Sequence, residues 1–123
     1  MDPYYKAKLK EMVDVNSYTE NAAGIAEVAR LTRHLFLPLG FNESTTIQSM
    51  QHPKFGEHLF LHKPSKLLHR RRGKAVKSVP AVALTSHLDT VFPKEVELKH
   101  DFRWKEGPDG MIRGPGVVVS FVL

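Results

Sequence analysis

The amino-acid sequence predicts one domain, or part of one, of the α/β class. Two segments near the N-terminus carry apolar residues at helical spacing, and two strand-like runs follow them. Residues 79–85, "VPAVALT", are then apolar on both alternating faces, as in a strand that helices cover on both sides. Helices packed against a mixed sheet are therefore the expected architecture.

Length and composition also favour a folded chain. The 123 residues suit a single domain, and 41% apolar with 25% charged residues is close to the globular average. Because the chain has no cysteine, a metal ion would have to be held by imidazole and carboxylate groups. The N-terminus lacks the apolar core of a signal peptide, and no run approaches the roughly 20 apolar residues of a membrane span. We therefore expect a soluble, cytoplasmic protein without a membrane partner.

The first helix is expected over residues 3–14. Asp2 suits the N-cap, and Pro3 suits the first helical position, where its missing N–H leaves no hydrogen bond unmade. The apolar residues at helical spacing are Tyr5, Leu9, Met12 and Val13. They predict a single apolar stripe along this helix.

A second helix is expected after the polar segment "NSYTENAAG". Either Thr19 or Asn21 can cap its N-terminus, and Pro38 and Gly40 end it. The residues predicted to form its inward face are Ile25, Val28, Ala29, Leu31, Leu35 and Phe36.

The remaining elements are shorter. Residues 41–50 and 55–62 are strand-like and predict a hairpin, and residues 63–78 combine proline, glycine and charge as an exposed connector does. Near the C-terminus, Asp109-Gly110 is a tight-turn signal between two short extended pieces. Phe102 and Trp104 are expected to cover the sheet edge or the core.

Two polar residues follow the predicted strand at 79–85. His87 and Asp89 are two positions apart, so in an extended chain they point to the same side, whereas Leu88 points into the packing. A neutral imidazole is a good zinc ligand, and a neighbouring carboxylate can fix its tautomer. Spacing alone also allows the alternative, a hydrogen-bonded pair at a strand end with no metal.

The stretch "SHLDTVFP", residues 86–93, resembles the metal-binding strand end of the dinuclear-zinc aminoacylase and carboxypeptidase family. This family includes glutamate carboxypeptidase, acetylornithine deacetylase and succinyl-diaminopimelate desuccinylase. Three more segments look like that family in the same order: residues 12–41, "GEHLFLHKP" and "DGMIRGPGV". The resemblance implies that residues 1–123 are the N-terminal part of a three-layer αβα zinc-exopeptidase catalytic domain, ending before the other metal ligands and the dimerisation domain.

The resemblance also implies roles for particular residues. His87 would bind one of two zinc ions, and Asp89 would be the catalytic-site carboxylate that orients His87. In the family, the turn that corresponds to Gly114-Pro115-Gly116 leads to an aspartate that bridges both metals, but Val119 stands at that position here. Two zinc ions repel strongly without an anionic bridge, and valine has no lone pair to offer. We therefore expect at most weak zinc binding by this chain.

Three functions remain open. The first is a zinc-dependent metallohydrolase, a carboxypeptidase or deacylase acting on amide bonds of peptides or N-acyl amino acids, of which this chain alone is inactive. The second is a non-catalytic module that self-associates through an exposed apolar edge at "VVVSFVL". The third is nucleic-acid binding through the basic loop 63–77, for which a solvated loop is the favoured alternative because no aromatic residues interleave.

The chain has seven histidines, but only His87 is a candidate metal ligand. His58 and His62 are four apart, which in a strand separates them by about 13 Å, too far for one ion. Surface or structural roles are expected for every histidine other than His87.

Overall fold

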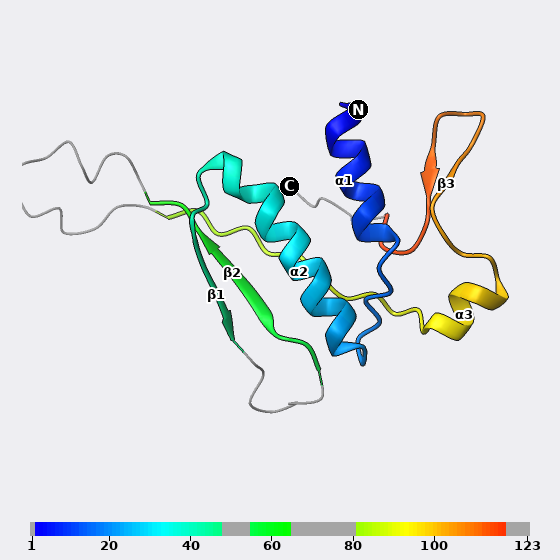
Figure 1. The fold of residues 1–123 in the computed structure, drawn as a ribbon, viewed down its shortest axis with the longest axis horizontal. Coiled ribbons are helices and arrows are strands. Elements are labelled where there is room, and N and C mark those ends of the chain that lie inside the picture. The colour runs from blue at the N-terminus through cyan, green and yellow to red at the C-terminus, as the bar shows by residue number, and fades with distance from the viewer. Residues whose placement is uncertain (1, 48–54, 65–80, 118–123) are drawn as a thin grey trace, which may run out of the picture.

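The computed structural model describes residues 2–47, 55–64 and 81–117. These ranges form a small mixed α/β fold with three α-helices and two antiparallel two-stranded sheets (Figure 1). The elements are α1 (Pro3–Val13), α2 (Ala22–Phe36), the 3-10 helix η1 (Leu37–Leu39), β1 (Glu43–Ile47), β2 (His58–His62), α3 (Lys94–Lys99), β3 (Lys105–Glu106) and β4 (Ile112–Arg113). The α/β class is thus confirmed.

The N-terminal helix α1 begins as predicted. The side chain of Asp2 accepts a hydrogen bond from the backbone N–H of Tyr4 at 2.8 Å, and Pro3 occupies the first helical turn. The helix ends at Val13, one residue before the predicted end. The cap and the proline therefore define this helix start locally.

The second helix, α2, is capped by Asn21, whose side chain accepts a hydrogen bond from Gly24 N–H at 3.2 Å. The predicted inward face is confirmed: its N-terminal half is buried, and Leu31, Leu35 and Phe36 are half-buried. After Phe36 the chain continues into η1, and Gly40 ends it at a φ of +89°, a conformation that favours glycine.

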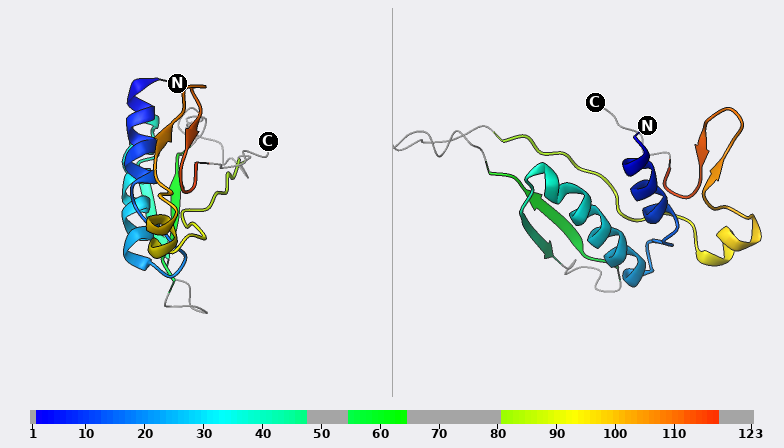
Figure 2. Two further views of the ribbon diagram at one scale, coloured as in Figure 1. Left: turned by 90° about the vertical axis from the view of Figure 1, so that its right-hand side faces the viewer. Right: turned by 45° about the horizontal axis from the view of Figure 1, so that its top comes forward.

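The core lies where α2 faces the hairpin β1–β2. Ile25, Val28 and Ala29 are the buried hydrophobic residues of the described ranges. Figure 2 places α1 and α2 on the same side of the strands. A Cβ built on Gly56 would lie 2.5 Å from Ile25 Cγ2, so Ile25 packs directly against the backbone that leads into β2. The apolar face of α2 therefore organises the fold.

Strands β1 and β2 form the predicted hairpin. They pair antiparallel from Glu43 opposite His62 to Ile47 opposite His58. The His62 ring also contacts the Glu43 carboxylate, with Nδ1 at 2.7 Å from Oε2. Each strand is hydrogen-bonded along one edge only, because the sheet has two strands within the described ranges.

The prediction of a buried strand at residues 79–85 is wrong for residues 81–85, which are the part of it that the structure describes. Residues 81–85 are extended but belong to no sheet, and Val82 and Leu84 are 89% and 90% exposed. An apolar run forms a buried strand only if a neighbouring strand pairs with it and helices cover it. Within the described ranges β1 and β2 pair with each other only, so the expected mixed sheet is absent there.

The helix α3 in the C-terminal part was not predicted from the sequence. It follows Pro93 and carries Glu95 and Glu97 in its first turn, where acidic side chains favour the helix dipole. Six residues are too few for a helical apolar period to be recognised. The tight turn is confirmed, because β3 and β4 pair antiparallel around Gly110, whose φ is +73°.

An ion pair links the N-terminal helix α1 to strand β3. Lys6 Nζ on α1 lies 2.6 Å from Glu106 Oε2 on β3. The hydrogen bond from Lys6 holds the pKa of the Glu106 carboxyl below its usual value. Both side chains are partly exposed, so the pair contributes little stability. It shows that Lys6 lies on the side of α1 that faces β3.

Candidate functional site

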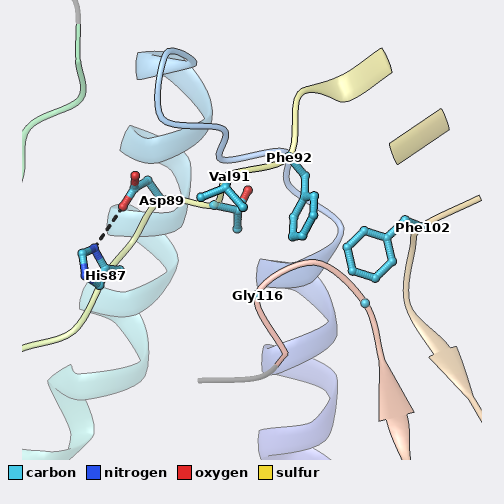
Figure 3. A pocket seen from close by; sticks show the side chains of 8 residues that line it. His87, Asp89, Val91, Phe92, Phe102 and Gly116 are labelled. Carbon is cyan, nitrogen blue, oxygen red and sulfur yellow. Dashed lines mark ion pairs between the residues drawn. The ribbon is translucent and has the colours of Figure 1, made fainter. Parts of the chain in front are cut away.

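His87 and Asp89 lie close together, as their spacing predicts. His87 Nδ1 is 3.3 Å from Asp89 Oδ1, and Figure 3 shows the two side chains facing each other. The His87 side chain is 93% exposed and the Asp89 side chain 30%. Leu88, between them, is half-buried. The proximity is confirmed, whereas the roles of ligand and orienting carboxylate stay predictions.

The backbone beside Asp89 is held by the segment between α1 and α2. Thr90 N–H donates to the Ser17 carbonyl at 2.8 Å, and Thr19 N–H donates to the Thr90 carbonyl at 3.0 Å. These bonds make a parallel bridge between Tyr18 and Thr90. We call these two backbone hydrogen bonds of Thr90, to Ser17 and Thr19, the clamp. Ser17 is buried, so the clamp lies at the edge of the core.

A side-chain contact reinforces the clamp. The Thr19 hydroxyl donates to Asp89 Oδ2 at 2.7 Å and also lies 3.2 Å from the Thr90 carbonyl oxygen. In the sequence, Thr19 stood out only as an alternative cap for α2. Since Asn21 provides that cap, the Thr19 side chain is available for Asp89. No local pattern signals this contact, because the two residues are 70 positions apart.

A partly open cavity of about 460 Å³ adjoins His87 and Asp89 (Figure 3). One wall is apolar, where the Phe92 and Phe102 rings meet edge to face with their centroids 4.8 Å apart. The residues around the cavity are His87, Asp89, Thr90, Val91, Phe92, Phe102, Gly114 and Gly116. Phe102 thus belongs to the cavity wall, whereas the Trp104 indole N–H donates to Glu106.

The turn Gly114-Pro115-Gly116 reaches the same cavity. A Cβ built on Gly116, whose φ is +70°, would lie 3.3 Å from Thr90 Cγ2. Two of the four segments that carry the resemblance, "SHLDTVFP" and "DGMIRGPGV", are therefore neighbours in space. Val119, the residue at the position of the bridging carboxylate, lies outside the described residues.

The described residues do not fit a complete zinc centre. A catalytic zinc generally needs three protein ligands and a water, and no group of three or more histidine, aspartate or glutamate side chains gathers within residues 2–47, 55–64 and 81–117. His58 and His62 lie on β2, where His62 contacts Glu43. At the candidate site, His87 with Asp89 is the one imidazole–carboxylate pair that the described residues offer to a metal.

The basic loop 63–77 lies mostly outside the described residues. Of its lysines and arginines, Lys63 is described, and its ammonium lies 5.8 Å from the centre of the Phe41 ring. The prediction about nucleic acid therefore stays a prediction.

No helix of the described ranges combines the length and the apolar character that crossing a membrane requires. Comparison of the chain with protein-family models, with curated proteins and with solved structures gave no match.

Proposed function

We propose that this chain provides the first metal ligand of a zinc-dependent metallohydrolase that acts on amide bonds of peptides or N-acyl amino acids. His87 is the ligand, and Asp89 orients it. The proposal includes the three-layer αβα zinc-exopeptidase domain, of which residues 1–123 are the N-terminal part, and a cytoplasmic location. The observation that carries it is the contact between His87 Nδ1 and Asp89 Oδ1 at 3.3 Å.

This contact supports the proposal for a physical reason. Histidine ligands usually present one ring nitrogen to the metal and donate the N–H of the other to a carboxylate, which fixes the tautomer and raises the basicity of the ligand. With Nδ1 turned toward Asp89, Nε2 is the nitrogen left for a metal. The His87 side chain is also exposed, so an ion can reach it without any rearrangement of the core.

Hydrolysis requires more than this. A single imidazole does not hold a zinc ion in a catalytic geometry, and Val119 supplies no bridge between two ions. We therefore expect the 123-residue chain alone to bind zinc weakly and not to hydrolyse N-acyl amino acids. Turnover of such a substrate by the purified chain with zinc would contradict this expectation.

A zinc titration followed by histidine NMR signals tests the ligand assignment. We expect zinc to perturb the His87 ring, and His87→Ala to weaken binding about tenfold or more, because the ligand is lost. Asp89→Asn should weaken binding by a smaller factor, since the amide orients the ring less well. His58→Ala, an exposed histidine on β2, is the matched control and should bind zinc as the wild-type chain does. Unchanged affinity in His87→Ala would refute the assignment.

A second candidate function is self-association with another copy of this chain. The apolar edge predicted at "VVVSFVL" lies outside the described residues apart from Val117, but residues 81–85 offer such a surface. Val82 and Leu84 are exposed and two positions apart, so they share one side of an extended segment. Residues 81–86, "AVALTS", carry no charge, and two copies can pair antiparallel without repulsion.

Light scattering over a range of concentrations tests this candidate. We expect the apparent mass of the wild-type chain to rise with concentration and Leu84→Lys to suppress the rise, because each copy would bring a charged side chain into the apolar paired segment. Leu98→Lys on α3, where the leucine is 73% exposed, is the matched control and should associate like the wild type. A wild-type chain that stays monomeric at high concentration would remove the candidate.

A further inference from the structure

We propose that Thr19 is a positioning residue for His87 and acts through Asp89. Thr19 Oγ1 donates to one carboxylate oxygen of Asp89 at 2.7 Å, and the other oxygen faces His87 Nδ1 at 3.3 Å. The hydroxyl, the carboxylate and the imidazole thus form a chain from the core edge to the exposed ring. The part of this inference that concerns zinc rests on the proposed function, whereas the part that concerns the His87 tautomer does not.

The Thr19 hydroxyl has one proton and two acceptors within reach, and Asp89 is the favoured one. The Asp89 oxygen is closer, at 2.7 Å against 3.2 Å for the Thr90 carbonyl. It also belongs to a carboxylate, and hydrogen bonds to charged acceptors are stronger than those to neutral ones. The Thr90 carbonyl already accepts the backbone N–H of Thr19. The hydroxyl proton therefore goes to Asp89.

Asp89 needs such a partner because regular secondary structure does not hold it. Residues 81–89 belong to no helix or strand, and the first backbone anchor along this segment is the bridge at Thr90. That bridge fixes the backbone but leaves the Asp89 side-chain torsions free. A hydrogen bond to Oδ2 restricts them, and the β-branched Thr19 side chain is itself stiff. Oδ1 is then kept toward His87.

The chemical consequence is a choice of tautomer. A carboxylate oxygen held beside Nδ1 favours the neutral ring that carries its proton on Nδ1, and this leaves the Nε2 lone pair for a metal. Loss of the Thr19 hydroxyl frees the carboxylate to turn away. The His87 ring then loses the partner that selects this tautomer.

The test is the His87 tautomer in the metal-free chain, read from long-range proton–nitrogen NMR spectra at a pH where the ring is neutral. We expect the Nδ1–H form to dominate in the wild type, to decline in Thr19→Val and to recover in Thr19→Ser, which restores a hydroxyl. Thr32→Val removes a hydroxyl that bonds within α2 and should leave His87 unchanged. Thr19→Ala repeats the comparison without added bulk if valine disturbs the fold. If Thr19 only stabilised the fold, Thr19→Val would not change the His87 tautomer while Thr19→Ser restored it.

Zinc titration of the same variants separates the two proposals. Thr19→Val should weaken zinc binding by no more than Asp89→Asn does, with recovery in Thr19→Ser, because Thr19 contacts Asp89 and acts on the His87 ligand only through that carboxylate. If the tautomer and the zinc affinity of Thr19→Val both equal those of the wild type, the positioning role is overturned while His87 remains the ligand. If the tautomer shifts but zinc never perturbs His87, the proposed function fails and the positioning role stands.

Discussion

Gly24→Ala is expected to destabilise the chain by about 3 kcal/mol, although alanine is the better helix former. A Cβ on Gly24 would lie 2.0 Å from the Asn16 carbonyl oxygen and 2.7 Å from Asn21 Nδ2. Both are closer than any real contact. Because the nearest atom belongs to the backbone, it cannot move aside as the end of a flexible side chain can.

The damage should extend beyond α2. Asn21 Nδ2 donates to the Asn16 carbonyl at 2.7 Å, and Asn16 Nδ2 donates to the Phe92 carbonyl at 3.0 Å. To make room for the methyl group, the chain at Asn16 has to shift, and both bonds are disturbed. The neighbouring residues Ser17 and Thr19 hold Thr90 and Asp89, so the His87–Asp89 contact should loosen as well.

Urea unfolding followed by far-UV circular dichroism measures the loss of stability. Ala26→Gly is the control in the same helix, at an exposed position where the reverse change costs about 1 kcal/mol through propensity alone. A Gly24→Ala chain that is as stable as the wild type, or more stable, would contradict this prediction. It would show that the gain in helix propensity outweighs the collision of the added Cβ with the Asn16 carbonyl oxygen.

Ile25→Ala is expected to cost about 3 kcal/mol, the usual range for removing most of a buried isoleucine. Ile25 is 5% exposed and is one of three buried hydrophobic residues in the described ranges. Its side chain lies between α2 and the backbone at Gly56. Since that backbone cannot collapse onto α2 without moving β2, the substitution should leave a cavity.

The same unfolding measurement tests this prediction. Ile47→Ala on β1 is the matched control, because that isoleucine is 51% exposed and its loss should cost less than about 1 kcal/mol. If both variants lose the same amount of stability, the contact between α2 and the hairpin is not the centre of the core.

Much of the fold could be predicted from local sequence. The caps at Asp2 and Asn21, the end of the continuous helical segment α2–η1 at Gly40 and the turn at Gly110 each depend on groups within about four residues. Such interactions have the same chemistry in any tertiary context, so residue type and spacing reveal them. The helix α3 was not predicted, because six residues are too few to show a helical spacing of apolar side chains.

The candidate site was predictable only in part. The spacing of His87 and Asp89 indicates that their side chains can meet, and they do. The same local pattern also predicted a buried strand before them, which the exposed residues Val82 and Leu84 contradict. Alternation shows which side chains can share a face, but not whether another strand lies beside that face.

The sequence by itself determined the two capped helices, the hairpin, the tight turn and the pairing of His87 with Asp89. Only the tertiary structure decided that Thr19 binds Asp89, that the turn at Gly116 packs on Thr90 and that residues 81–85 stay uncovered. The physical reason is distance along the chain. Thr19 and Asp89 are 70 positions apart, and the packing of the whole fold, not any local preference, brings a hydroxyl donor to that carboxylate.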